Sequence, residues 1–441
     1  VVDEERYPNR KVQEKPGEEY ISPFTGGPVK TEPKMKDEPI NRLSLPIEQD
    51  IVNIHTAFTV GTEPSMDFTA NDTGEQNLYD ALTTLLLKTK SKYKNKKVVR
   101  SWLSEKQVAE YWFTEDNPKF WNGIYKRNGI KGEKPRVSLN STIWSPFRGD
   151  GLYPLYDEKG KMVAFSREYK STVNEEEITH FMTLDDTYIY EWEHKEEWEY
   201  KGKKKHGFNK IPVIYAERDK TLCERIRNLR ERLEALISSY ADCIDYHFFP
   251  YLWLDSDNID FQGGSKSRII KLQNGSNIGY LTWDQVPTTI KLEMENLISQ
   301  IYGLTNTPRI SFDNLKSFGQ ALSGTAFKFM FMGIHAAVEN HAEEIGEFFQ
   351  RRVNFLIDSL GKICSAFNEP SQSIMIDVNI VPYMIDSLKD KVETAVKAVE
   401  GKVWSIKEGI AFAGNIDEIV EEYEQICLEN EIDIKQPAKT E

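Results

Sequence analysis

The chain has 441 residues, of which 39% are hydrophobic and 29% are charged, and its formal net charge is −14. The length allows two or three domains with ample core, and the composition predicts a soluble globular protein. The acidic balance argues against a protein that simply coats DNA or a membrane, because non-specific phosphate binding needs clustered Lys and Arg. It leaves open a protein past which DNA slides, since an acidic wall prevents sticking.

The cysteine spacing and the length of the apolar runs indicate the kind of environment in which the protein is expected. Four cysteines stand far apart without CxxC spacing, which predicts reduced thiols in an intracellular setting. No run of about 18 apolar residues occurs, so we expect no membrane span. The chain begins at Val1 without the charged and then apolar start of a signal peptide. We therefore expect the numbering to begin inside a longer chain.

The N-terminal 100 residues change from an arm to helices. Residues 1–50 are rich in Pro, Glu and Lys, and they predict either disorder or an arm that orders against a neighbouring subunit. Apolar residues at helical spacing then predict helices ending near Gly61 and covering 74–88. The basic run 88–100 allows two interpretations, a nucleic-acid contact or a solvated helix end and loop, and we favour the second.

The middle of the chain alternates between helical and strand patterns. Residues 101–127 are predicted to be helical, with their aromatic side chains in the core. Apolar and polar residues alternate over 136–200, which predicts a small antiparallel sheet. The run 201–207 is predicted to be a hairpin loop before a strand at 211–218. A capping box at Thr221 and Glu224 then opens a helix that fades near residue 247.

The last third of the chain centres on one long helix. Short strands and turns over 251–283 lead to a helix after Pro287, which ends near Thr305. A polar loop follows, and then one face of apolar residues predicts a helix that runs to Phe367. A strand and three helices, near 384–400, 405–413 and 416–430, complete the chain. The fold class is therefore α+β and mainly helical.

The sequence contains none of three common catalytic and phosphate-binding motifs. It has no Walker-type phosphate loop, no GxGxxG after a strand and no GxSxG elbow, so we expect no enzyme, no catalytic residue, no cofactor and no metal site. His335 and His341 are metal-ligating types near Glu339, but their spacing places them on diverging helix faces, which favours structural or surface roles. The pair Asp185-Asp186 is predicted to lie in a solvated turn.

The order of these features resembles the portal (connector) proteins of tailed bacteriophages, of the long-tailed siphophage type. The resemblance covers about residues 40–436, and its motifs are specific through their order and spacing. Ser323-Gly324-Thr325-Ala326-Phe327-Lys328 keeps an SG-x-A-L-K pattern, with Phe at the usual Leu. The stretches that carry the resemblance are IVNIHTAFTVGTEP (51–64), LYPLYDEKGKMVAFSREY (152–169), DDTYIYEWE (185–193), HGFNKIPVIYAER (206–218) and ALSGTAFKFMFMGIHAAVE (321–339).

The resemblance implies a division of the chain into named parts, with a long spine helix and small β modules in the wing and the clip. These parts are an extended N-terminal arm (1–40), the wing (41–220), a stem helix (221–250), the clip (251–284), a second stem helix (285–306), the tunnel loop (307–322), the spine helix and strand of the wing (323–382) and the crown (383–441).

The resemblance also implies the function and the partners. A portal is a ring of usually twelve subunits at one capsid vertex of the virion, assembled in the host cytoplasm, and double-stranded DNA is packaged and ejected through it. Its partners are further copies of itself, the terminase large subunit, the major capsid and scaffolding proteins and a head–tail adaptor, without a membrane. Twelve helices packed about 10 Å apart enclose an opening of about 28 Å, which admits duplex DNA.

Three sets of residues follow from this resemblance as candidates for contact. Lys316, Ser317, Phe318 and Gln320 on the tunnel loop would face DNA, although a polar loop packed on its own subunit is the alternative. Glu293 and Glu295 would line the stem channel and repel phosphate, or pair with Lys or Arg between subunits. Clip residues that would bind the motor are Lys266, Arg268 and Lys271.

Two alternatives from other functional classes remain. Another phage head–tail or capsid-associated structural protein would lack ring symmetry with a through-channel. A DNA-processing enzyme that uses the basic runs 88–100 and 201–210 would show nuclease or ATPase activity in the isolated chain. The missing catalytic motifs disfavour the enzyme.

Overall fold

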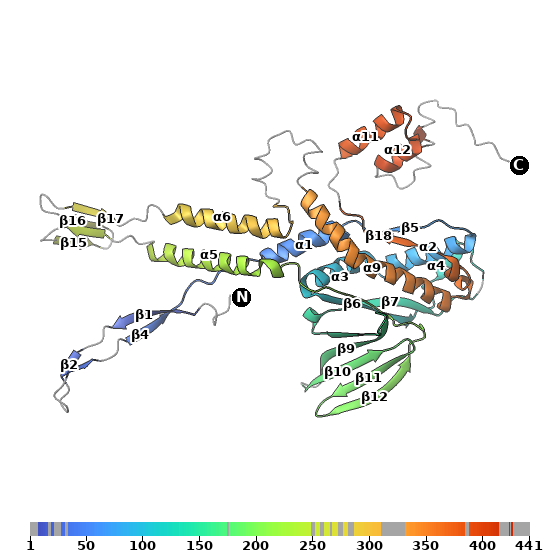
Figure 1. Ribbon diagram of the computed structural model, residues 1–441, viewed down its shortest axis with the longest axis horizontal. Coiled ribbons are helices and arrows are strands. Elements are labelled where there is room, and N and C mark those ends of the chain that lie inside the picture. The colour runs from blue at the N-terminus through green and yellow to red at the C-terminus, as the bar shows by residue number, and fades with distance from the viewer. Residues whose placement is uncertain are drawn as a thin grey trace. The chain divides into compact units, whose positions relative to one another are not determined.

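The computed structural model divides the chain into two compact units, residues 1–54 with 219–307 (unit 1) and residues 55–218 with 308–441 (unit 2). Figure 1 labels the helices and strands, and each unit is described by itself. The residues that the structure describes are 8–15, 19–21, 28–30, 34–131, 133–173, 176–247, 252–255, 260–264, 267–271, 277–280, 286–309, 331–383, 388–413, 423 and 425–426.

Unit 1 is built on two long helices that pack against each other, α5 (Arg227–His247) and α6 (Val286–Leu304) (Figure 1). Leu233 of α5 and Ile301 of α6 are fully buried, because apolar residues at helical spacing form one face of each helix. This pair confirms the two helices that the sequence predicts on either side of a β insert. The strands of the insert are β14 (Leu252–Asp255), which pairs with β17 (Asn277–Tyr280), and β15 (Asp260–Gly264), which pairs with β16 (Ser267–Lys271).

The segment that precedes helix α1 (Ile47–Val60) is fastened along α5. Backbone N–H groups of residues 41–45 donate to side chains of α5 that are spaced four residues apart and therefore share one helix face. The pairs are Asn41 with Asp242 Oδ1 at 2.8 Å, Leu43 with Ser238 Oγ at 3.0 Å, and Leu45 with Glu234 Oε1 at 3.0 Å. Before this segment the chain forms two strand pairs, β1 (Arg10–Lys15) with β4 (Lys34–Glu38), and β2 (Glu19–Ile21) with β3 (Pro28–Lys30).

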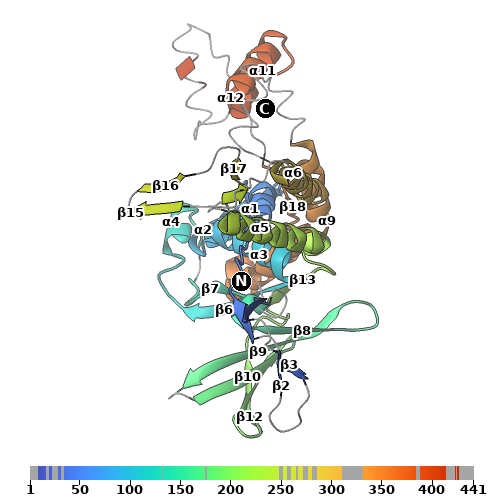
Figure 2. The same cartoon turned by 90° about the vertical axis from the view of Figure 1, so that its left-hand side faces the viewer.

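Unit 2 contains a three-stranded and a five-stranded antiparallel sheet. The three-stranded sheet has the order β13-β6-β7, and the five-stranded sheet has the order β12-β11-β10-β9-β8 (Figure 2). Trp144, Phe165, Leu184 and Tyr215 bring one face of each sheet into a shared core. The strands are β6 (Gln107–Asp116), β7 (Val137–Trp144), β8 (Gly151–Tyr156), β9 (Met162–Val173), β10 (Glu176–Leu184), β11 (Tyr188–His194), β12 (Trp198–Lys205) and β13 (Val213–Glu217).

In unit 2, the long helix α9 (Met332–Ile363) packs against α2, against β13 and against β18 (Asp377–Asn379), which pairs with β5 (Ser65–Asp67). The described part of the predicted spine is therefore one continuous helix of 32 residues. The other helices of this unit are α2 (Thr73–Lys88), α3 (Ser91–Glu105), α4 (Asn122–Arg127), α10 (Pro370–Ser373), α11 (Leu388–Glu400) and α12 (Ile406–Ala413). Short 3₁₀ turns occur at Pro146–Arg148, at Glu224–Ile226 in unit 1 and at Ser365–Phe367.

One predicted helix is wrong over most of its length. Residues 101–127 are predicted to be helical, but β6 occupies Gln107–Asp116 and pairs with β7 and β13 on its two sides. A short apolar run cannot be assigned by periodicity alone, and the β-branched and aromatic residues of this run suit a central strand. The prediction that its aromatic residues pack in the core is confirmed, because Trp102, Trp112 and Trp121 are buried.

Two loop predictions are wrong over part of their length. Residues 201–205 belong to β12, where Lys203 pairs with Tyr190 and Lys205 with Tyr188. A lysine-rich sequence suits this strand because β12 is at the edge of its sheet, where charge prevents further pairing. In the basic run 88–100, only Thr89 and Lys90 interrupt the helices, since Lys90 takes a left-handed φ of 58° and α3 starts at the next residue.

Two glycines of α9 are expected to respond in opposite directions to alanine. A Cβ at Gly361 would lie 2.2 Å from Ser371 Oγ and 2.7 Å from Ser371 Cβ, whereas a Cβ at Gly346 meets nothing within 4 Å. We expect Gly361→Ala to destabilise the protein by about 1–3 kcal/mol through overpacking. Gly346→Ala should stabilise it by about 0.5–1 kcal/mol through helix propensity. Urea unfolding of both variants checks this, and equal effects would contradict it.

Candidate functional site

The candidate channel residues lie on the paired helices of unit 1. Glu293 of α6 accepts hydrogen bonds from Arg232 of α5, at 2.8 Å from Nη2 and 3.0 Å from Nε. Glu295 lies 3.9 Å from Lys291 of its own helix. All four side chains are exposed, so these are solvated ion pairs, which contribute about 0–1 kcal/mol each. The prediction allowed pairing of Glu293 with a cation between subunits, and the structure gives it a cation within its own chain.

The predicted clip and tunnel-loop residues are placed only in part. Arg268 and Lys271 lie on β16, where the backbone of Arg268 pairs with Gly263 and that of Lys271 pairs with Asp260. Lys266 lies outside the described residues. The four tunnel-loop candidates, Lys316, Ser317, Phe318 and Gln320, also lie outside the described residues, in the stretch 310–330.

The histidines of α9 meet different partners. His341 is buried, with its Nε2 3.1 Å from Nδ1 of His55 and its ring edge-on to Trp102. His335 packs its ring against Phe58 instead. The structural roles that the six-residue spacing predicts agree with these contacts. Among the described residues, no group of three or more His, Cys, Asp and Glu side chains has the arrangement of a metal site.

The acidic pair Asp185-Asp186 follows the end of β10. Asp185 lies in the turn between β10 and β11 and accepts a hydrogen bond from the backbone N–H of Thr187 at 2.7 Å, so the predicted turn is confirmed. No helix in the described part of the chain combines the length and the apolar character that a bilayer crossing requires.

The comparison with known families decides what these parts belong to. Residues 24–436 match the family described as "Phage portal protein, SPP1 Gp6-like". The chain belongs to this family of phage portal proteins. Membership gives the portal protein a structural, connector role at a capsid vertex, as part of a ring assembly.

No curated protein matches the portal chain. Among solved structures, it is similar to a chain from the neck of an empty GTA particle, computed with C6 symmetry, at 9% identity and a TM-score of 0.47. That similarity covers 84% of this chain and 90% of the other.

A buried polar network, which the sequence did not reveal, fixes α9 to the rest of unit 2. Arg352 of α9 donates from Nε to Glu110 Oε2 of β6 at 2.6 Å and from Nη1 to Asn95 Oδ1 of α3 at 2.5 Å. Ser141 of β7 donates to the other Glu110 oxygen at 2.7 Å. The side chains of Arg352 and Glu110 are only 4% and 1% exposed, so each charge depends on the other for compensation.

Lys94 of α3 extends the network toward solvent. Its Nζ donates to the backbone oxygen of Ser141 at 2.8 Å and to Ser141 Oγ at 2.9 Å. Burial lowers the pKa of Lys94, and the nearby Glu110 carboxylate opposes that shift. A signal for the network exists in the sequence only as charged residues within apolar runs, because its members are separated by up to 257 residues.

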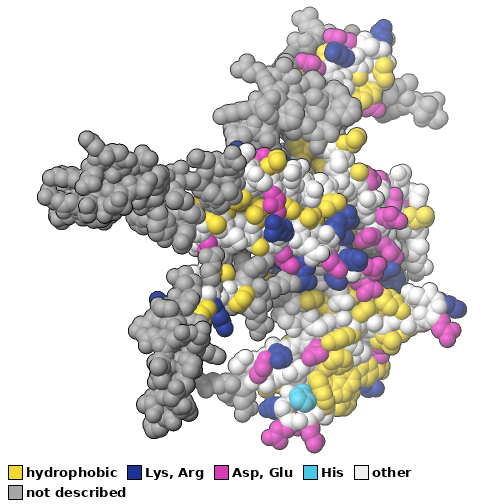
Figure 3. Space-filling model, turned by 60° about the vertical axis from the view of Figure 1, so that its left-hand side comes forward, with side chains coloured by type: hydrophobic (Ala, Val, Ile, Leu, Met, Phe, Trp, Pro, Cys, Tyr) yellow, Lys and Arg dark blue, Asp and Glu magenta, His cyan; other side chains and the backbone are white. Residues whose placement is uncertain are grey.

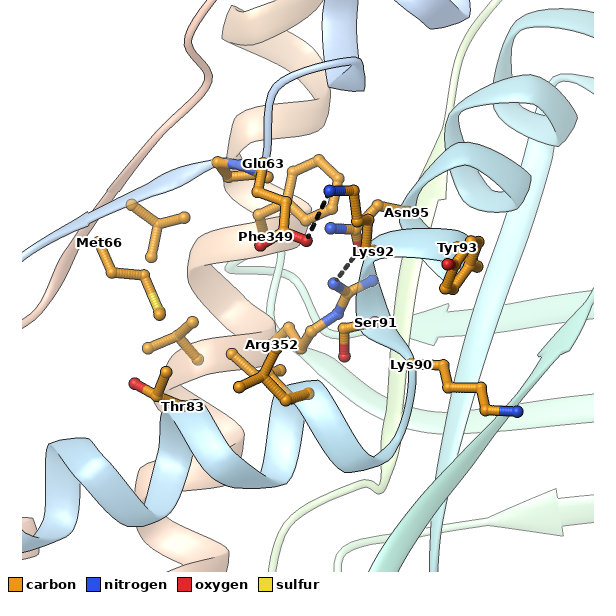
Figure 4. A pocket seen from close by; sticks show the side chains of 15 residues that line it. Glu63, Met66, Thr83, Lys90, Ser91, Lys92, Tyr93, Asn95, Phe349 and Arg352 are labelled. Carbon is orange, nitrogen blue, oxygen red and sulfur yellow. Dashed lines mark hydrogen bonds and ion pairs between the residues drawn. The ribbon is translucent and has the colours of Figure 1, made fainter. Parts of the chain in front are cut away.

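A pocket of about 480 Å³ lies beside this network (Figure 4). Arg352 and Asn95 form part of its wall, together with Lys92, which lies 3.8 Å from Glu63. The rest of the wall is mainly apolar, with Met66 and Phe349 among its residues. Three of the charged side chains in the wall, Glu63, Lys92 and Arg352, are therefore already paired within the chain.

Proposed function

We propose that this chain forms the ring-shaped conduit at one capsid vertex through which double-stranded DNA is packaged and later ejected. The family match over residues 24–436 is the observation that carries the proposal. A pair of long helices with a small β insert between them, followed by a polar stretch and a long helix, supports it, because a ring of such helices encloses a bore. The chain acts without catalysis, and the motor that hydrolyses ATP is a separate protein.

The proposed parts have separate tasks. The clip (251–284) receives the terminase large subunit during packaging and a head–tail adaptor afterwards. The wing (41–220) and the spine segment (323–382) form the body of the ring and meet the major capsid and scaffolding proteins. DNA passes the stem helices and the tunnel loop and leaves through the crown (383–441). Assembly takes place in the host cytoplasm, and the finished ring stays in the virion.

The channel chemistry follows from the proposed DNA contacts. Lys316, Ser317, Phe318 and Gln320 would touch the duplex, and Lys266, Arg268 and Lys271 would bind the motor. Glu293 and Glu295 would line the stem. Because Glu293 pairs with Arg232 at 2.8 Å, the lining at this level would be a mosaic of paired charges. Such a surface gives DNA few free cations to bind, which suits sliding because each released counterion strengthens binding.

Electron microscopy of the purified full chain tests the proposal. We expect closed rings, of twelve or a neighbouring number of copies, with a central opening wide enough for duplex DNA. A chain that stays monomeric under all conditions, including those of capsid assembly, would overturn the ring and with it the conduit. Rings without a through-channel would favour another head–tail structural protein.

The tunnel-loop residues are tested by packaging. We expect the double variant Lys316→Ala with Phe318→Ala to assemble normally but to retain several-fold less DNA per capsid. The loop then lacks the amino group of Lys316 and the aromatic side chain of Phe318 that would contact the duplex. Lys195→Ala, in the exposed turn between β11 and β12, is the matched control and should package normally. Normal packaging by the double variant would remove these two residues from the DNA-facing set.

A further inference from the structure

The five-stranded sheet of unit 2 has an aromatic face on the side away from its core. An antiparallel sheet with one buried face normally carries polar residues on the other. Here the register places Tyr200 opposite Trp192 and Trp192 opposite Phe181, so that these aromatic side chains are neighbours on one face of the sheet. We call this set the aromatic face, and its members are Tyr153, Phe181, Tyr188, Tyr190, Trp192, Trp198 and Tyr200.

The rings of this face, contributed by four of the five strands, lie close to one another. The ring centroid of Phe181 lies 6.2 Å from that of Tyr153 and 6.1 Å from that of Trp192, and Trp192 lies 5.5 Å from Tyr200. Trp198 and Tyr200 are each 53% exposed, and Tyr153 is 49% exposed. Hydrophobic side chains gather into a broad patch on this part of the molecule (Figure 3). Contiguous apolar patches of this kind mark surfaces that another molecule covers.

Lysines border the aromatic face at its edge strand. Lys203 and Lys205 of β12 hold their amino groups 4.6 Å and 5.7 Å from the ring centroid of Tyr188. On the opposite side, the Tyr153 hydroxyl donates to the Glu168 carboxylate at 3.1 Å. An apolar centre with a charged rim is the usual anatomy of a protein interface. The rim carries both signs of charge, which fits a partner segment that also carries both.

The described strands of the N-terminal arm form two separate two-stranded ribbons. Among the described residues, β1 pairs with β4 and β2 pairs with β3, and an isolated two-stranded ribbon is at best marginally stable. The described side chains of β4 are exposed, including Met35 at 50%. Residues 1–40 contain six prolines and a mixture of acidic and basic side chains. Proline-rich segments bind aromatic surfaces because their extended backbone is already ordered.

We propose that the aromatic face of one copy is covered by the N-terminal arm of a second copy of this chain. In a closed ring each copy gives one surface and receives a different one, so every copy can place its arm on a neighbour. Residues 41–45 are fastened to α5, so the arm extends from a fixed point. Folded back as a ribbon, residues 8–40 reach about 50 Å. The proposal rests on the ring assembly of the proposed function.

Assembly of the full chain tests both partners in this contact. The triple variant Trp192→Ser, Trp198→Ser, Tyr200→Ser and the deletion of residues 1–38 should each raise the concentration needed for ring formation by at least about tenfold, since large aromatic residues dominate interface energies. Tyr93→Ser, which removes an exposed aromatic residue of α3 outside the face, is the control and should assemble normally. Thermal unfolding of each monomer shows that the substitutions leave the fold intact.

Cross-linking identifies the segment that covers the face. A photo-reactive residue in place of Trp198, in unlabelled chains mixed with isotope-labelled chains, should cross-link to arm peptides of the other label. Cross-links to the arm of the same copy, to another segment, or to nothing within intact rings would overturn the proposal. Rings that form normally from the triple variant would also overturn it and leave the conduit standing. A wild-type chain that forms no ring would contradict both the arm contact and the proposed conduit.

Discussion

Replacing Arg352 with alanine is expected to lower the free energy of unfolding by about 3–5 kcal/mol, because it leaves the Glu110 carboxylate buried without its cation. Glu110 is 1% exposed and accepts from Arg352 Nε at 2.6 Å. Asn95 loses its donor in the same variant, which adds to the loss. Urea denaturation with circular dichroism measures the effect.

The neighbouring residue supplies a matched control for this variant. Arg351 pairs with Glu347 one turn away on the exposed side of α9, so Arg351→Ala should cost at most about 1 kcal/mol. The double variant Arg352→Met with Glu110→Leu removes both buried charges, and it should recover most of the loss. If Arg352→Ala and Arg351→Ala proved equally mild, the buried pair would not stabilise the fold in the way that its geometry indicates.

A decrease in pH from 7 to 5 is expected to destabilise the protein by about 2 kcal/mol through His341. Burial, together with the nearby charges of His55 and Arg218, lowers the pKa of His341 from its ordinary value of 6.5 to about 3. Below pH 6.5, His341 therefore binds a proton in the unfolded chain but stays neutral in the folded chain. This stability is fully present above pH 6.5 and is lost progressively as the pH falls toward 3.

Substitution of His341 separates this effect from general acid sensitivity. His341→Gln keeps a polar group beside His55, which lies 3.1 Å away, and removes the titration. Its free energy of unfolding should change between pH 7 and pH 5 by about 2 kcal/mol less than that of the wild type. His335→Gln, on the same helix, leaves the buried pair in place and should retain the full pH dependence. An unchanged pH dependence in His341→Gln would assign the acid sensitivity to other groups.

The sequence predicted most helices because their stripes of apolar residues are local signals. The helices α2, α5, α6 and α9 carry apolar residues on one face over three or more turns, and propensity and burial agree there. In residues 107–116, periodicity alone does not distinguish a helix from a strand. Their apolar and aromatic run is compatible with a buried helix or a central strand, and pairing with β7 and β13, distant in the chain, selects the strand.

The sequence predicted some features of the candidate site and missed others. The order of short motifs was sufficient to predict the portal family, and the family match over 24–436 confirms it. The sequence also placed Glu293 and Glu295 on a helix correctly. It did not predict that Glu293 pairs with Arg232, because that contact depends on how α5 and α6 pack, and 61 residues separate the two side chains.

The sequence by itself determined the family, the apolar faces of the helices and the absence of known catalytic motifs. Each of these features is defined by residues that lie close together in the chain. Only the tertiary structure decided which charges are buried and which rings share a face. Arg352 and Glu110 are 242 residues apart, and Trp192 meets Phe181 and Tyr200 through strand register. A shift of one residue in that register would turn the aromatic rings toward the core, so their exposure is a property of the folded sheet.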